Sequence, residues 1–400
     1  MQTEAHDTIR AGTRPWASLL AATLVGLPLG SIYAFSVFLK PLEQLLGITR
    51  SEMSIVFGIA TVCYTVGANI TPYLFGRLPA PILLLLAGAI SGSGMVLASQ
   101  ASSIIDLAVG YGLLFGIGGG LSFCVVQQCV NLLVRTNQGL VNGYLISLFP
   151  LGAMVAAPVF GWGIELLGVR LTLLAVGAVL ALTGLIGFAL IQLSGVRLSD
   201  AAITGKSGGS YRISNPASFW KVFFVFFFAA AAGLTMLSQA AGIVQAYGGT
   251  TAAALAATTV ITASIAAARI TGGWLVDRYP IPYVAVGAQI IALTGAILLT
   301  LYPSVFVCIL AINMIGVGYG LISGVMAGSI AAYWQRNEYG RIASRMYVAW
   351  CIAAISLPIV AARFFDLTGG YHMAILLAGG CNLMAIFVGS TLPRRNRMVV

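Results

Sequence analysis

Apolar residues are grouped along this chain in long runs, which polar and charged positions interrupt at fairly regular intervals. A helix needs about 20 consecutive apolar residues to cross the hydrocarbon core of a bilayer. Twelve runs reach about this length, at residues 16–39, 53–75, 80–98, 104–134, 139–164, 170–193, 217–246, 252–276, 281–301, 305–334, 342–365 and 371–392. The pattern therefore predicts an all-α membrane protein with twelve transmembrane helices.

The longest polar segment between these runs, residues 194–216, divides the twelve predicted helices into two groups of six. We therefore predict an N-terminal six-helix half over residues 1–193, a cytoplasmic linker over 194–216 and a C-terminal six-helix half over 217–400.

The two predicted halves also resemble each other in sequence. The stretch FGIGGGLSF at 115–123 returns 200 residues later as IGVGYGLIS at 315–323, and PVFGWGIELLG at 158–168 has a counterpart in PIVAARFFDLTG at 358–369. Both halves begin on the same side and contain six runs, so the copies run parallel. Parallel repeats of this kind occur in transporters, where the substrate site lies between the two halves.

Composition supports a membrane environment and helps to orient the chain. Hydrophobic residues make up 59% of the chain and charged residues 8%, and the mean hydropathy is +0.99. A soluble domain could not bury so much apolar surface in its core. Fifteen basic residues fall in the tails and the loops on the N-terminal side, against four on the other side. The positive-inside rule then places both termini in the cytoplasm, and we expect a bacterial inner membrane. The net charge of +10 forms no basic stripe, so we expect no nucleic-acid partner.

Candidate catalytic and metal-ligating groups are absent from the predicted spans. All ten acidic residues lie in tails, loops or helix ends, and the six cysteines lie in apolar runs without a CxxC spacing or a histidine pair. We interpret the cysteines as small hydrophobic residues. The sequence predicts no metal, no cofactor and no enzyme, and the spans are too apolar to line a channel.

One basic residue, Arg269 in AAARITGGWLVDR, lies inside a predicted span with no acid at the same depth. An arginine at this depth costs about 2.5–3.5 kcal/mol on insertion scales, so something must offset it. Three interpretations are open. The side chain snorkels to the interface, it binds backbone carbonyls at a helix break, or it faces a water-filled cavity and binds a substrate anion.

Several stretches resemble the major facilitator superfamily. GGWLVDRYPIPY, after the span at 252–276, resembles the G-x-L-x-D-R loop signature, whereas GRLPAP in the equivalent loop of the first half lacks the aspartate. GSIYAFSVFLKPLEQLLGITRSEMSIVFG, QGLVNGYLISLFPLG and NPASFWKVFF resemble, more narrowly, the branch of oxalate/formate antiporters and monocarboxylate transporters.

This resemblance implies the major facilitator fold and roles for three residues. Arg269 matches the arginine that binds the substrate carboxylate, and Tyr33 and Tyr319 match cavity tyrosines. Cys351 stands where oxalate-type members carry a second cation, a lysine, and Ile265 stands where proton-coupled members carry an aspartate. Phe123, Phe149 and Ile315 replace further cavity aromatics. These departures argue against dicarboxylate binding and against the usual proton relay.

Other polar residues complete the candidate cavity. Asn131 and Gln239 lie within predicted spans, and Tyr347, Trp350, Cys351 and Ala354 share one helical face. For each of them, a helix–helix contact remains as open as substrate contact.

A gate is predicted at the cytoplasmic end of the span at 252–276. Asp277, followed by Arg278, could accept hydrogen bonds from the amino-terminal end of the span at 342–365, or pair with Arg341 or Arg345. A solvated loop pair is the alternative.

Together these features predict a secondary active transporter that moves small organic anions, such as lactate or formate with oxalate as a further candidate, by alternating access. An unpaired arginine in an empty, closing cavity favours exchange, and symport stays open. A monomer would suffice as the functional unit. The alternative is a drug or metabolite exporter in which Arg269 is structural.

Overall fold

The computed structural model describes residues 13–198, 214–302 and 304–394, and these residues form helices without any strand. The first half contains α1 (Pro15–Leu29), η1 (Gly30–Ala34), α2 (Ser36–Leu46), α3 (Arg50–Leu74), α4 (Ala80–Ser99), α5 (Ile104–Leu107), η2 (Ala108–Phe115), α6 (Gly116–Leu133) and α7 (Gln138–Ser194). The second half contains α8 (Pro216–Ala246), α9 (Thr251–Val276), α10 (Ile281–Leu301), α11 (Val305–Tyr333), η4 (Arg336–Glu338), α12 (Tyr339–Thr368) and α13 (His372–Ser390).

Eleven segments of the described chain are long and apolar enough to cross a membrane. One of them, α7, has 57 residues and contains two spans, because Gly168 interrupts it with a φ of 82° that a residue with a side chain rarely adopts. Dividing α7 at Gly168 yields twelve spans. The predicted all-α, twelve-helix membrane fold is therefore confirmed. Most of the predicted linker 194–216 lies outside the described residues, so its bounds remain predictions.

Two of the predicted helices are interrupted rather than continuous. The run at 16–39 breaks at η1, a 3₁₀ turn that follows Pro28, and its second part continues as α2. The run at 104–134 contains η2, a π-helical stretch of eight residues. The 3₁₀ turn η1 contains Tyr33, one of the residues that the resemblance places in the cavity.

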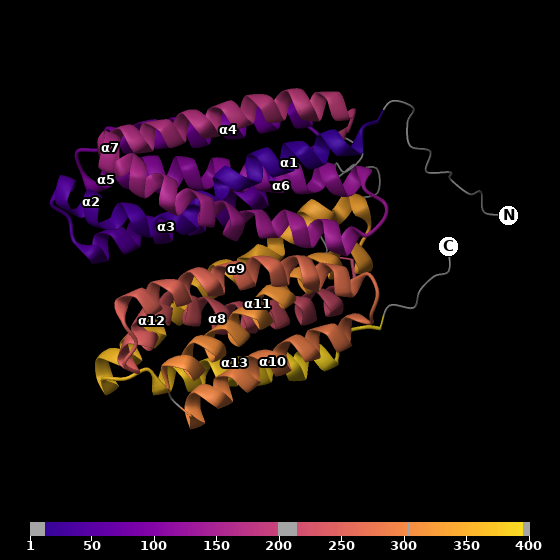
Figure 1. Ribbon diagram of the computed structural model, residues 1–400. Helices are drawn as coiled ribbons and strands as arrows, with labels where there is room; N and C mark the ends of the chain where they lie inside the picture. The colour runs from indigo at the N-terminus through magenta and orange to yellow at the C-terminus, as the bar shows by residue number, and fades with distance from the viewer. Residues whose placement is uncertain (1–12, 199–213, 303, 395–400) are drawn as a thin grey trace.

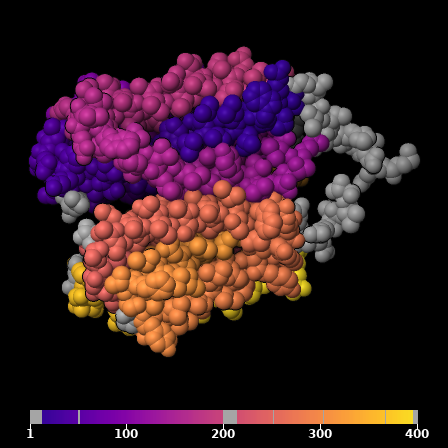
Figure 2. Space-filling view, viewed as in Figure 1, coloured from indigo at the N-terminus to yellow at the C-terminus, as the bar shows by residue number. Residues whose placement is uncertain are grey.

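The chain folds into two helical bundles that lie side by side (Figure 1). Residues before 199, joined by Ala327, form one buried hydrophobic core, and residues from 219 onward form the other. The first and last described residues lie at one end of both bundles, together with both ends of α7 and the carboxyl-terminal end of α13. We call this the terminal end. The bundles meet there and stand apart at the opposite end, near α2 (Figure 2).

The glycine repeat occupies equivalent positions in the two bundles. A Cβ at Gly120 on α6 would meet the carbonyl oxygen of Tyr64 on α3, and a Cβ at Gly320 on α11 would meet that of Ile265 on α9. Small residues allow helix backbones to approach this closely. The sequence repeat therefore corresponds to a repeat of helix packing.

The most extensive contact between the two bundles is the crossing of α7 with α9 near the terminal end. Here a Cβ at Gly273 would lie 2.0 Å from the carbonyl oxygen of Gly139, and one at Gly143 would lie 2.4 Å from that of Arg269. Backbone atoms cannot yield to such contacts as a flexible side chain can. The crossing therefore requires glycine on both helices.

We expect Gly273→Ala to lower the apparent melting temperature of the purified protein, because overpacking costs typically about 1–3 kcal/mol. Gly287→Ala is the matched control, because nothing lies within 4 Å of a Cβ at that position on α10. Thermal unfolding of both variants in detergent measures the difference. Equal melting temperatures for the two variants would contradict a tight crossing.

Candidate functional site

Two adjoining cavities lie between the bundles at the centre of the molecule. The larger has a volume of about 710 Å³ and extends from Arg269 along α7, α8 and α9 toward the end opposite the terminal end. The smaller, which we call the inner chamber, has a volume of about 20 Å³ and adjoins the first cavity. Tyr33, Arg269 and Tyr319 line both cavities and so form the boundary between them.

Arg269 projects from α9 into this boundary, and its side chain is only 6% exposed. Its NH1 group donates a 2.7 Å hydrogen bond to the carbonyl oxygen of Ile146 on α7, in the other bundle. Its NH2 group donates a 3.1 Å bond to the hydroxyl of Tyr319, whose ring centre lies 5.5 Å from the guanidinium carbon. The guanidinium thus points into the bundle interface, and the snorkelling interpretation is wrong.

The carbonyl of Ile146 is available because of Pro150. In an α-helix the carbonyl of residue i accepts from the N–H of residue i+4, and proline has no N–H. Pro150 therefore leaves the Ile146 oxygen without an intrahelical donor, and Arg269 supplies one from the opposite bundle. The interpretation in which Arg269 binds a backbone carbonyl describes a contact that is present.

This contact leaves most of the guanidinium unused. An arginine has five N–H donors; the two bonds described engage two of them, and the Tyr33 hydroxyl lies beside the guanidinium as a further neighbour. The Nε group is buried and has no hydrogen-bond partner among the described residues. No described acidic side chain forms an ion pair with Arg269. The site therefore combines an uncompensated positive charge with free donors at a cavity wall.

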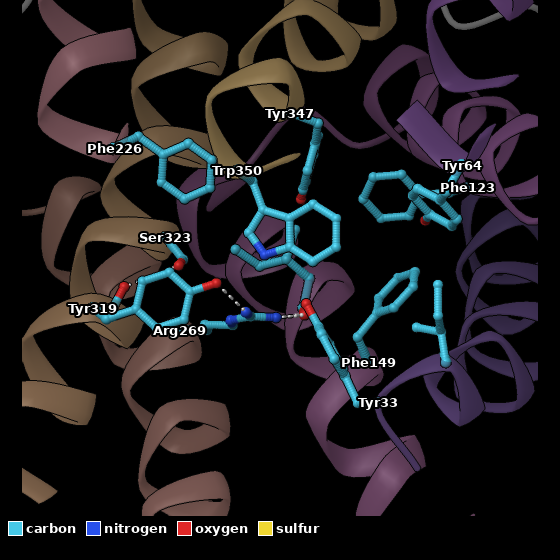
Figure 3. A pocket seen from close by; sticks show the side chains of 12 residues that line it. Tyr33, Tyr64, Phe123, Phe149, Phe226, Arg269, Tyr319, Ser323, Tyr347 and Trp350 are labelled. Atoms are coloured by element: carbon cyan, nitrogen blue, oxygen red, sulfur yellow. Dashed lines mark hydrogen bonds between the residues drawn. The ribbon is translucent and has the colours of Figure 1, made fainter. Parts of the chain in front are cut away.

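Aromatic side chains form most of the inner chamber around this charge (Figure 3). Tyr33 stands edge-on to Phe149 at 6.4 Å and to Trp350 at 6.1 Å between ring centres. The full lining consists of Ile32, Tyr33, Tyr64, Phe123, Ile146, Phe149, Phe226, Arg269, Tyr319, Ser323, Tyr347 and Trp350. Such a chamber has room for about one water molecule, and its mostly apolar lining strengthens any electrostatic interaction with Arg269.

The sequence-predicted site residues fall into two groups. Arg269, Tyr33 and Tyr319 lie together at the boundary between the cavities, and their role in substrate binding stays a prediction. Cys351 does not line either cavity, because its buried Sγ faces the carbonyl of Thr61 at 3.9 Å. Gln239 is also absent from both linings, whereas its neighbour Ser238 lines the larger cavity.

Asn131 forms a structural contact instead of facing substrate. Its amide exchanges two 2.8 Å hydrogen bonds with the amide of Asn142, which joins α6 to α7 inside the first bundle. Both side chains are buried, and both also donate to a carbonyl one turn earlier. The helix–helix alternative describes this residue.

Sequence reasoning missed part of the site. Tyr347 and Trp350, on the predicted face of α12, line the chamber, whereas the resemblance had pointed to their neighbour Cys351. The Ile146 carbonyl was also missed, although Pro150, four residues later, was a usable signal.

Asp277 binds the amino-terminal end of a helix, but not the predicted one. Its two carboxylate oxygens accept 2.8 Å hydrogen bonds from the backbone N–H groups of Gly139 and Leu140, in the first turn of α7. The predicted contact with α12 is wrong, because α9 crosses α7 at the terminal end and brings Asp277 to the start of that helix. The carboxylate satisfies two of the four free N–H groups there and interacts favourably with the helix dipole.

Within the described part of the chain, Asp277 forms no ion pair with the other predicted gate residues. Arg278 packs its guanidinium over Trp274 on the same helix, 4.1 Å from the ring centre. Arg341 forms an ion pair with Glu338, three residues earlier. Arg345 is half-buried on α12.

The neutral side chain of Gln128 joins the start of α12 to the first bundle by hydrogen bonds. The side chain of Gln128 on α6 accepts a hydrogen bond from the Gly340 N–H and donates one to the carbonyl of Arg336. Asn69 on α3 adds a 2.9 Å bond to the carbonyl of Ser344. Two different sets of hydrogen bonds therefore close the terminal end. The charged carboxylate of Asp277 makes one set, and the neutral amides of Gln128 and Asn69 make the other.

Residues 20–358 match the family model described as Major Facilitator Superfamily. Rat monocarboxylate transporter 13 is 23% identical over 384 residues, which cover 94% of this chain and 89% of that protein. An uncharacterized MFS-type transporter of Escherichia coli, YhjX, is 22% identical over 178 residues, 44% of each chain. Human monocarboxylate transporter 1 is 25% identical over 158 residues, which cover 37% of this chain and 31% of that protein. The chain thus matches less than half the length of these last two relatives.

Solved structures share the fold at low identity. The proton:xylose symporter XylE has a TM-score of 0.74 at 14% identity, with 95% of this chain and 96% of that chain covered. A human organic anion transporter has a TM-score of 0.71 at 13% identity, with coverage of 94% and 99%.

We expect Asp277→Asn to open the terminal end more often, because an amide offers one acceptor oxygen in place of two and carries no charge. Losing such a cap costs typically about 1 kcal/mol. Spin labels at Thr136 and Tyr279, on either side of the contact, report the separation as a longer-distance population.

The matched control is Asp106→Asn. Asp106 also accepts from two backbone N–H groups, those of Ser102 and Ser103, but within one bundle. If both variants give the wild-type distance distribution, Asp277 is not a gate.

Proposed function

Because the chain belongs to the major facilitator superfamily, we propose that it carries small monocarboxylates, such as lactate or formate, across the membrane by alternating access. The chain is a multi-pass membrane transporter of this superfamily; its substrate and mechanism are the proposal. A single chain encloses the cavity, so we take the monomer as the functional unit.

The observation that carries the proposal is the uncompensated guanidinium of Arg269 at the cavity boundary. A carboxylate is the planar anion that a guanidinium binds with two parallel hydrogen bonds. One bound monocarboxylate would neutralise the charge that no described acid neutralises. A dicarboxylate such as oxalate would bring a second charge, for which the lining of either cavity offers no second cation.

The orientation follows from the charge distribution. The terminal end carries the basic loops that the positive-inside rule assigns to the cytoplasm. The larger cavity opens away from that end, so the arrangement corresponds to an outward-open carrier. A bacterial inner membrane would place this opening at the periplasm.

Substrate binding and the movement of the two halves are coupled through the Arg269–Ile146 hydrogen bond. This bond joins α9 to α7 across the two halves and must break when the halves part at the terminal end. A bound carboxylate replaces a neutral carbonyl with a charged acceptor, and charge-assisted hydrogen bonds are roughly twice as strong. The loaded carrier therefore parts its halves at lower cost than the empty one. This asymmetry favours exchange, although symport also fits if a proton accompanies the anion.

The printed names of the relatives agree with a carboxylate substrate. Most of the relatives described above are monocarboxylate transporters. The alternative is a drug or metabolite exporter in which the Ile146 bond is the whole role of Arg269. The free donors on its guanidinium favour the carboxylate.

Counterflow in proteoliposomes tests the proposal. We expect the wild type to exchange labelled lactate or formate, and Arg269→Gln to lose at least about 100-fold in exchange activity, because two charge-assisted bonds are worth roughly 1.5–3 kcal/mol each. We expect Arg269→Lys to recover only part of the activity, because a lysine cannot bind both oxygens in parallel.

Arg170→Gln is the matched control. Arg170 also donates to a backbone carbonyl, that of Ala101, but it does so outside the cavities. Carboxylate flux that persists at the wild-type rate in Arg269→Gln would refute the proposal, as would a wild type that carries no small carboxylate.

A further inference from the structure

We propose that the indole N–H of Trp350 donates a hydrogen bond to an acceptor on carbon 2 of the substrate, and that Trp350 thereby selects 2-hydroxy and 2-oxo acids over unsubstituted ones. This inference rests on the proposed function, because it places the substrate carboxylate on Arg269.

The first observation is an unused donor. Trp350 on α12 is 6% exposed and lines the inner chamber; its Nε1 group lies beside the Tyr33 hydroxyl but forms no hydrogen bond of normal geometry with any described residue. Trp334, buried to the same extent, donates its indole N–H to the carbonyl of Ser214. A buried donor without a partner costs about 1–3 kcal/mol, so its occurrence at a cavity wall points to a ligand.

The second observation is the direction of this donor. The Trp350 ring meets Tyr33 edge-on at an interplanar angle of 76°, and its nitrogen faces the space between the Tyr33 hydroxyl and the Arg269 guanidinium (Figure 3). The two N–H sources thus converge on one place from α9 and α12. A group bound to Arg269 lies next to the indole nitrogen.

The third observation concerns which substrate atom remains for Trp350. The free N–H groups of Arg269, with the Tyr33 hydroxyl beside them, provide enough donors for both carboxylate oxygens. The next position along the substrate is carbon 2. The indole nitrogen only donates, so it rewards an oxygen acceptor at carbon 2 and offers nothing to a methylene.

The fourth observation is the size and charge of the chamber. A volume of about 20 Å³ admits a group of roughly the size of one water molecule. Arg269 is the one charged residue in the lining of the chamber, so its walls provide no charge for a second carboxylate. A hydroxyl or a keto oxygen fits both limits, with the rest of the substrate extending into the larger cavity.

The test compares lactate with propionate, which differ only in the hydroxyl on carbon 2. Competitive uptake into proteoliposomes gives the ratio of kcat/KM for the two acids. We expect Trp350→Phe to lower the wild-type lactate preference about 3- to 10-fold, through a higher KM for lactate and an unchanged KM for propionate.

Two further variants separate a donor role from a packing role. Trp350→His keeps a ring N–H in a smaller ring and should retain more of the lactate preference than Trp350→Phe. Trp334→Phe loses an indole donor outside the cavities and should leave the preference unchanged.

Different outcomes count against different claims. If wild type carries both acids without preference, or if Trp350→Phe slows both equally, the role of Trp350 is overturned while carboxylate transport stands. If wild type carries neither acid, the proposed function itself fails. If Trp350→Phe does not reach the membrane, the wild-type preference and its retention in Trp350→His decide the matter.

Discussion

The structure is organised around one guanidinium that is buried between two halves without a described acidic partner. Arg269 is held by the Ile146 carbonyl and the Tyr319 hydroxyl, both neutral acceptors, so its hydrogen bonds are partly satisfied while its charge is not. That distinction matters because the cost of burying an arginine is mainly the cost of its charge. These two contacts hold the side chain in place without a ligand, and in the proposed function a bound anion neutralises the remaining charge.

The same residue links the site to the closure of the terminal end. Arg269 lies one to two turns before the point where Gly273 meets Gly139 and Asp277 caps α7. All three contacts join α9 to α7, so the proposed anion site and the proposed gate belong to one pair of helices. On the other side of the interface, the neutral amide of Gln128 holds the start of α12. The helix packing within the two halves is thus repeated, whereas the hydrogen bonds between the halves differ, with a carboxylate on one side and a neutral amide on the other.

Much of the fold could be predicted from hydropathy, because a span must be long and apolar wherever it lies in the chain. Of the site, Arg269 was predictable for the same reason, since a charge in an apolar run is conspicuous. Asn131 was not, because a polar residue in a span reads alike whether it faces a cavity or pairs with Asn142. Cys351 and Trp350 are adjacent on α12, and only the rotation of the helix decides that Trp350 faces the chamber. The partner of Asp277 depended on which helices cross between the halves, and a single sequence does not contain that information.

The central claim is that cargo charge neutralises Arg269, and it is tested most directly by comparing lactate with lactamide, a neutral molecule of nearly the same shape. Equilibrium binding to the purified protein measures both affinities, for the wild type and for Arg269→Gln. The account predicts that the wild type binds lactate far more tightly than lactamide and that this preference disappears in Arg269→Gln. Equal wild-type affinities, or a preference that survives the loss of the guanidinium, would contradict it.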